Sequence, residues 1–201
     1  MRLRILLFCG LLAACSALPP ADAPPIRTYR IDYPVPPPAP VTAPFTLRVI
    51  PFGTAATYDR PGFIYRTATY DFGIDFYNRW AVAPGSMLTD LVARDIAAAQ
   101  LVRAVLQAPS AIPTDYELHG EIEEFEERDT GGGAAHLRMR AFLVQVPRTG
   151  PRTVVVNEII EIDEPCRPGD PESFTAAMSR AAQRASEMLR AHIAQALEAG
   201  E

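Results

Sequence analysis

The stretch DYELHGEIEEFEERDTGGGAAHLRMRAFLVQVPRTGPRTVVVNEIIEID, residues 115–163, decides the fold of this chain. Along most of it apolar residues alternate with polar ones, which is the pattern of strands that bury one face. The run of three glycines at 131–133 supplies a turn without side-chain restraint between the first two strands. The sequence therefore predicts a three-stranded meander, and its apolar positions are Tyr116, Leu118, Ile122, Leu137, Met139, Ala141, Leu143, Val154, Val156, Ile160 and Ile162.

A turn centred near Gly131 also predicts which residues face each other across the first two strands. Glu121 then lies opposite Arg140, and Glu123 lies opposite Arg138. Opposite charges across a pair of strands suit a face in contact with water. We interpret the acidic run around these residues as a solvated face paired with arginine, and a cation site is the alternative.

The last element is predicted to be a long amphipathic helix. Asp170 can cap its first turn, Pro171 occupies the first helical position, and Gly200 stops the helix. Its apolar residues recur at helical spacing and form one stripe, so the helix is expected to dock on a sheet. The stripe comprises Phe174, Met178, Ala181, Ala185, Met188, Leu189, Ala196 and Leu197.

Upstream of the meander the sequence predicts three further strands and a second helix. Strands are expected at 45–52, 63–67 and 69–76, because these segments are rich in aromatic and β-branched residues. A helix that covers the sheet opens near Pro84, and the segment 101–106 fits either its last turn or a short strand. The predicted fold class is α+β. It is a single domain with a mixed, mainly antiparallel sheet of about five or six strands covered by two main helices.

The N-terminus reads as a targeting signal. Two arginines precede an apolar run of about ten residues, which is too short to span a bilayer and suits a signal peptide. The run ends in Leu12-Ala13-Ala14-Cys15, the bacterial lipobox pattern, so we predict cleavage between Ala14 and Cys15 and lipid attachment to Cys15. An ordinary secretory signal with a chance cysteine is the alternative. By analogy with bacterial lipoproteins, Ser16 after the cysteine favours the periplasmic face of the outer membrane.

Half of the chain's 20 prolines fall between Pro19 and Pro44. Proline fixes the backbone and removes a hydrogen-bond donor, so this stretch is expected to form an extended tether. A short strand is predicted near 28–33, in a proline-free segment. The domain organisation is therefore a signal peptide at 1–14, a lipidated proline-rich tether at 15–44, and a folded domain at 45–201.

Charge excludes one class of function. All 19 basic residues are arginine, and removal of the signal with Arg2 and Arg4 leaves 17 of them against 24 acidic residues, a formal charge of −7. Nucleic-acid binding normally needs a basic patch, so no nucleic-acid partner is expected. The same balance offers no polybasic attraction to anionic lipid, so the lipid on Cys15 must attach the protein to the membrane.

No motif of catalytic chemistry stands out. In the predicted register His136 lies opposite Phe125, which is six residues along the strand from His119. The two histidines are then about 20 Å apart, too far to bind the same metal ion. Cys166 is the one cysteine left in the folded part, and it has no histidine near it in sequence, so we interpret it as a small, partly buried residue. The glycine run lacks the lysine and helix of a phosphate-binding loop. We therefore expect no enzyme activity, no cofactor and no metal.

The order of these features resembles the family of ABC-type transport auxiliary lipoproteins, whose best-known type is the paraquat-inducible lipoprotein C. The resemblance covers nearly the whole mature chain, and the proline-rich spacer at 34–44 departs from the pattern. The matching motifs are the lipobox, Tyr29-Arg30-Ile31, the strand at 45–52, Ile64-Tyr65-Arg66, Tyr70, Arg79-Trp80, Pro84 and Met87-Leu88.

The resemblance implies a non-catalytic envelope lipoprotein that serves an ABC transporter together with an MCE-domain protein. Such systems move lipids or other hydrophobic molecules between the inner and outer membranes, and a homo-oligomer would fit them. Arg79 and Trp80 are candidates for contact with a partner, although a lone Trp beside a helix start is more often a core residue. The alternative function is an assembly or interaction lipoprotein of another envelope complex, in secretion or cell-wall synthesis.

Overall fold

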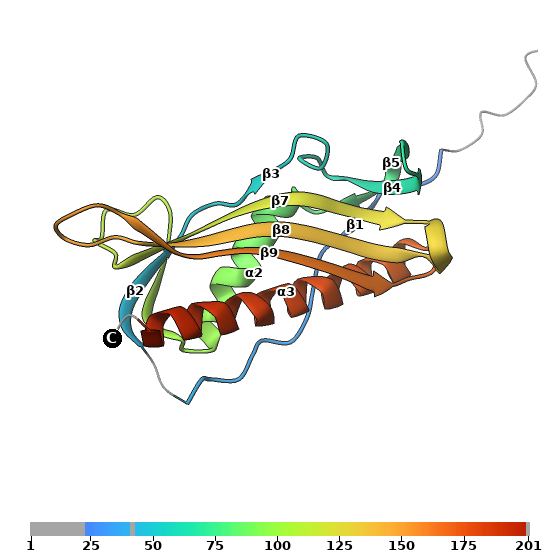
Figure 1. Ribbon diagram of the computed structural model, residues 1–201. Helices are drawn as coiled ribbons and strands as arrows, with labels where there is room; N and C mark the ends of the chain where they lie inside the picture. Colours follow the sequence, from blue (N-terminus) through green and yellow to red (C-terminus); the bar gives the residue numbers. More distant parts are fainter. Residues whose placement is uncertain (1–22, 41–42, 200–201) are drawn as a thin grey trace, which may run out of the picture.

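The computed structural model describes residues 23–40 and 43–199, and its central element is strand β7 (Tyr116–Arg128). Strand β8 (Ala134–Gln145) pairs antiparallel with β7, and β9 (Thr153–Pro165) pairs antiparallel with β8. The predicted meander is therefore confirmed (Figure 1). All of its predicted apolar positions are buried except Val154, which is 55% exposed. A register shift opposite the junction of Leu143 and Val144 separates Val154 from the inward-facing part of β9.

Three short strands dock one after another along the other edge of β7. All three run parallel to β7, and they pair successively with its start, middle and end. They are β2 (Ala43–Val49), β3 (Gly53–Thr54) and β4 (Gly62–Ala68). Beyond them the sheet continues through β6 (Val102–Gln107) on one side, and through β5 (Asp71–Trp80) and β1 (Arg27–Tyr29) on the other.

The predicted α+β class and the single domain are confirmed. The mixed sheet has nine strands within the described residues, more than the five or six expected, because β1, β3 and β6 add short parallel pairings. The long ladders of β7, β8 and β9 are antiparallel. The segment 101–106, which fits either the last turn of the helix or a short strand, corresponds to strand β6.

Both helices lie on the same side of the sheet (Figure 1). Helix α2 (Pro84–Ala98) packs on β6 and β7, and helix α3 (Pro171–Ala199) packs along β8 and β9 and touches α2. Asp170 caps α3 as predicted, since its carboxylate accepts hydrogen bonds from the backbone N–H groups of Glu172 and Ser173, both at 3.1 Å. The predicted stop at Gly200 lies outside the described residues.

The register predicted for the first hairpin is correct at Glu121 and wrong beyond it. Glu121 does pair with Arg140, but a bulge at Glu123 inserts one extra residue, so Arg138 lies opposite Glu124 and His136 lies opposite Glu126. The bulge lets Ile122 and Phe125 both point into the core, three residues apart. The carboxylate of Glu123 still accepts hydrogen bonds from both arginines, at 2.8 Å from Arg138 Nε and 3.1 Å from Arg140 Nε. The expected solvated, arginine-paired face is therefore present.

The segment ahead of β2 takes part in the fold. Strand β1 is shorter than the predicted 28–33, but Ile31 and Tyr33 after it are both buried. The Tyr33 hydroxyl donates a 2.9 Å hydrogen bond to the carboxylate of Asp95 in α2, which also accepts one from Ser186 in α3. The division of the chain into a tether and a domain at residue 45 stays a prediction. The structure adds that residues before this boundary contact both helices.

Candidate functional site

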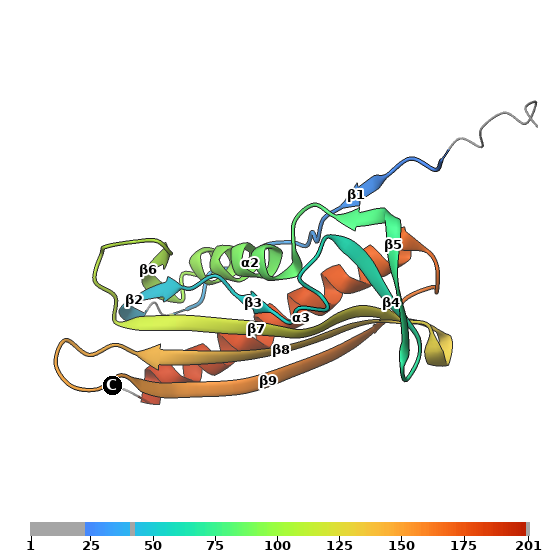
Figure 2. The same cartoon turned by 90° about the horizontal axis from the view of Figure 1, so that it is seen from above.

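One end of the molecule carries an irregular stretch of β5. Gly62 and Phe63 are neighbours on β4, yet they pair with Arg79 and Asp75 on β5. The three residues between these partners, 76–78, therefore have no counterpart on β4 and bulge out of the hairpin. Bulges of this kind re-aim side chains and are often found near functional sites. Figure 2 shows this end of the molecule, where β5 bends and runs beside β1.

Local polar contacts hold the bulge. One carboxylate oxygen of Asp75 accepts hydrogen bonds from the backbone N–H groups of Tyr77, at 2.8 Å, and Asn78, at 3.1 Å. The other oxygen accepts one from the Asn78 side-chain amide at 2.6 Å. Arg79 Nε donates a 3.0 Å hydrogen bond to the backbone carbonyl of Phe76. The bulge thus has a defined shape, in the manner of an Asx turn.

This defined backbone presents aromatic rings to water. Tyr70, at the turn of the β4–β5 hairpin, is 97% exposed, and Phe76 in the bulge is 69% exposed. Phe72 and Tyr77 are also exposed. Exposed apolar residues that stand singly are ordinary, but several aromatic rings on one hairpin indicate an interaction surface. We call these four residues of the β4–β5 hairpin the aromatic hairpin surface.

A pocket of about 190 Å³ lies beside the bulge. It lies between the β4–β5 hairpin, the end of β7 and the start of α3. Its lining residues are Phe63, Tyr65, Asp75, Asn78, Glu127, Asp129, Gly169 and Pro171. Glu127 is the buried acid of this pocket, and one of its carboxylate oxygens accepts a 2.9 Å hydrogen bond from the Gly169 backbone N–H.

Burial raises the pKa of Glu127 from its ordinary value to about 7. The negative charges of Asp129, Asp170 and Asp75 raise this pKa further, and the hydrogen bond from Gly169 opposes them. A carboxyl group with a pKa near neutrality can change its charge under ordinary conditions. The pocket therefore combines a titratable group with an acidic surrounding.

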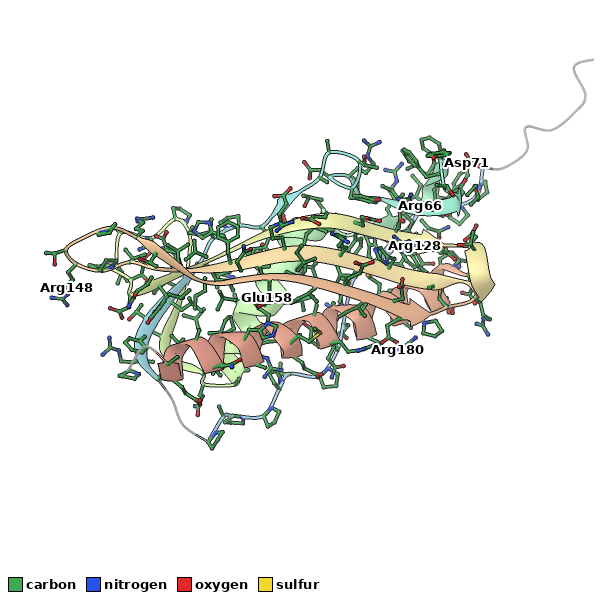
Figure 3. All side chains as sticks on the ribbon, in the orientation of Figure 1. Arg66, Asp71, Arg128, Arg148, Glu158 and Arg180 are labelled. Atoms are coloured by element: carbon green, nitrogen blue, oxygen red, sulfur yellow. The ribbon has the colours of Figure 1, made fainter. Side chains whose placement is uncertain are left out.

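The neighbouring acid on β7 behaves in the opposite way. Glu126 is 1% exposed, but it accepts hydrogen bonds from Arg66 Nε at 2.6 Å, the Tyr58 hydroxyl at 2.8 Å and Arg128 Nε at 3.1 Å. Burial raises its pKa, and these three donors outweigh burial, so the net pKa is lowered. In Figure 3 Arg66 and Arg128 lie at the same end of the molecule. The network fastens β4 to β7 beside the pocket.

The predicted site residues divide into three groups. Ala14 and Cys15 lie outside the described residues, so cleavage and lipid attachment remain predictions. Arg79 lies in the site, where it supports the bulge. Trp80 is 2% exposed and packs against Phe63, with ring centroids 4.3 Å apart, and against Phe125 and Phe174. Trp80 is therefore a core residue, the alternative considered above, and contact between Arg79 and a partner stays a prediction.

The remaining candidates, the histidines and Cys166, do not come together in a metal site. Within residues 23–40 and 43–199, no three His, Cys, Asp or Glu side chains gather as a group able to hold a metal ion. His136 is fully buried and its Nδ1 lies 2.8 Å from the carboxylate of Asp163. Cys166 is buried, and burial raises the pKa of its thiol to about 11, as expected for an unreactive thiol.

Sequence reasoning missed the bulge and the pocket. The sequence predicts a strand over 69–76, because aromatic rings are common in strands. The segment Asp75-Phe-Tyr-Asn78 does contain a signal. An Asp side chain readily accepts hydrogen bonds from the backbone N–H groups two and three residues later, which favours an Asx turn. The pocket carries no local signal, since its walls come from three distant parts of the chain.

Comparison with known proteins identifies the family. The model of the ABC-type transport auxiliary lipoprotein component matches residues 29–190, so the chain belongs to that family. It is accordingly an envelope lipoprotein that assists an ABC-type transport system, and the resemblance seen in the sequence is confirmed at this level. The auxiliary role indicates a function other than catalysis. No curated protein matches the chain.

Solved structures confirm the fold. Protein XCC0632 from Xanthomonas campestris shares 21% identity at a TM-score of 0.73, over 87% of this chain and 100% of its own. The hypothetical protein CT253 from Chlamydia trachomatis shares 11% identity at a TM-score of 0.56, over 77% of this chain and 98% of its own. In the part of the chain that the structure describes, no helix is both long and apolar enough to cross a membrane.

Proposed function

We propose that this protein is the outer-membrane-anchored auxiliary lipoprotein of an MCE-linked ABC transporter. In this role lipid on Cys15 fixes the protein to the periplasmic face of the outer membrane. The folded domain then binds the MCE-domain protein or the transporter and contributes no catalytic step. The cargo is a lipid or another hydrophobic molecule that passes between the two membranes.

The family match over residues 29–190 is the observation that carries this proposal. The family serves ABC-type transport, and the lipobox at 12–15 supplies the means of attachment. The acidic domain has no basic patch to hold it on anionic lipid, which is consistent with attachment through the modified cysteine.

Photo-crosslinking in intact cells tests the partner directly. Amine-reactive reagents are unsuitable because the chain contains no lysine. A photoreactive amino acid should instead be placed at Arg79, beside the bulge, and in separate variants at Arg148, at the opposite end of the molecule (Figure 3). Recovery of an MCE-domain protein or a transporter subunit from either variant is the expected result.

The same experiment can contradict the proposal. Recovery of secretion or cell-wall components in place of transporter components would favour the alternative, an assembly lipoprotein of another envelope complex. Deletion of the gene gives an independent measurement. Loss of lipid traffic should sensitise the outer membrane to detergents and bile salts, and the wild-type chain supplied in trans should restore resistance.

A further inference from the structure

Two of the exposed rings of the aromatic hairpin surface, Phe76 and Tyr77, lie where the N-terminal segment joins the domain. Strand β1 runs parallel to the end of β5, with Arg27 opposite Asn78 and Tyr29 opposite Trp80. In this register the residues that precede Arg27 lie beside Tyr77 and Phe76, and the chain leaves the sheet there. Ile26, the last residue before β1, is 58% exposed and adds an apolar side chain at this point.

The segment that joins this point to the proposed lipid anchor is short. Eleven residues, 16–26, separate Cys15 from β1. Even fully extended in a polyproline conformation they reach about 35 Å, at roughly 3.1 Å per residue. A domain attached through Cys15 thus stays within a few tens of ångströms of the bilayer, and the surface at the junction is the part of the domain nearest the attachment.

The chemistry of this surface suits a lipid–water interface. Tyrosine rings have an apolar body and a polar hydroxyl, and they concentrate at the boundary between headgroups and hydrocarbon. The turn residues ahead of Tyr70 are uncharged. The two carboxylates of the hairpin itself form local hydrogen bonds, because Asp71 accepts a 2.6 Å hydrogen bond from the Thr67 hydroxyl and Asp75 accepts from the backbone of the bulge. Figure 3 shows Asp71 on this hairpin.

We propose that the aromatic hairpin surface inserts its rings into the interface of the lipid bilayer to which the protein is attached. This contact rests on the proposed attachment at Cys15 and adds a second point of membrane contact, formed by Tyr70, Phe72, Phe76 and Tyr77. Two points of contact fix the orientation of the domain, whereas attachment at Cys15 alone leaves it free to turn. The opposite end of the molecule then faces away from the membrane.

The test uses the full lipidated chain in vesicles of phosphatidylethanolamine and phosphatidylglycerol. A benzophenone amino acid replaces Phe76 in one variant and Arg148, at the opposite end, in the matched control. After illumination, mass spectrometry should detect lipid adducts of the Phe76 variant, at least tenfold more abundant than those of the Arg148 variant. Circular dichroism and Trp80 fluorescence confirm that both variants are folded, as expected because residue 76 is exposed.

Each other outcome overturns the proposal in a distinguishable way. Vesicle-bound protein without lipid adducts at position 76 shows that the rings stay in water, and leaves attachment at Cys15 intact. Crosslinks from position 76 to a transporter protein in intact cells, with lipid adducts absent, show a protein-binding surface instead. Protein that fails to co-sediment with the vesicles removes the attachment at Cys15, and with it this second contact.

Discussion

Glu127 links the charge of the pocket to the stability of the fold. Its pKa is raised to about 7 in the folded protein, so the folded state binds the proton more tightly than the unfolded chain does. The free energy of unfolding therefore falls as the pH rises from about 4.5 to about 7, and this effect is complete above pH 7. The group opposes folding at neutral and alkaline pH because its charge is poorly hydrated.

Replacement of Glu127 with Gln should remove that dependence. The amide oxygen can still accept the hydrogen bond from Gly169, and no charge remains to be buried. At about 1.4 kcal/mol per pKa unit, Glu127→Gln should be more stable than the wild type by roughly 3 kcal/mol at pH 8 and nearly equal to it at pH 4. Urea unfolding at both pH values measures this. An equal gain at pH 4 and pH 8 would contradict the assignment of the proton to Glu127.

Asp75 determines whether the aromatic bulge keeps its shape. Its carboxylate accepts from two backbone N–H groups and one side-chain amide, so Asp75→Ala leaves three donors without their partner. We expect a loss of about 1–2 kcal/mol in the free energy of unfolding. Faster amide exchange should be confined to residues 75–79.

Asp75→Asn is the matched control, because its side-chain oxygen can still accept from the backbone N–H groups. It should lose less stability than the alanine variant. If exchange rates in the bulge stay unchanged in Asp75→Ala, then sheet pairing, and not the carboxylate, shapes this segment.

At the scale of elements, the segment from β1 to β2 is fastened by one buried carboxylate. Asp95 is 1% exposed and binds Tyr33, Ser186 and Arg94, which brings the N-terminal segment, α2 and α3 together. Tyr33→Phe removes one of these hydrogen bonds and should cost about 2 kcal/mol. Hydrogen exchange should accelerate in residues 27–40 more than in the meander. Tyr29→Phe, which keeps the ring packed on Phe63, serves as the control.

Elements defined by local signals could be predicted from the sequence. Helix α3 has its cap, its proline and its apolar stripe within one segment, and the meander has alternation and a glycine turn. The order in which β2, β3 and β4 dock on β7 depends on pairings between residues about 60–70 positions apart, such as Leu47 with Tyr116. No local pattern encodes these pairings. The same is true of the pocket, which exists only after they form.

The bulge in β7 shows how one residue alters a register prediction. Strict alternation predicts Glu123 opposite Arg138, but two inward apolar residues, Ile122 and Phe125, stand three positions apart. Only an extra residue between them satisfies both. Beyond the bulge the alternation is reversed, so Glu127 lies on the inward side next to the pocket. The candidate site thus depends on a feature that strand periodicity alone does not reveal.

The whole molecule has two distinct ends. One end carries β1, the β4–β5 hairpin and the pair Arg66 and Arg128 (Figures 1 and 3). The pocket lies beside this hairpin, and β1 pairs with the end of β5 there. The other end carries the β8–β9 loop with Arg148 and the last turns of α3. An adaptor fixed to a membrane needs such a polarity, because one end must meet the lipid while the other remains free for a partner.

Removal of the lipid attachment tests this arrangement as a whole. Cys15→Ala should release a folded domain into the soluble periplasm, because the acidic, lysine-free chain has no electrostatic hold on the membrane and a few exposed rings bind a bilayer only weakly. Fractionation followed by immunoblotting measures the distribution, and circular dichroism of the soluble protein confirms its fold. Cys166→Ala serves as the control and should remain with the membrane, since that thiol is buried. Persistent membrane association of Cys15→Ala would show that residues other than Cys15 suffice to hold the protein there.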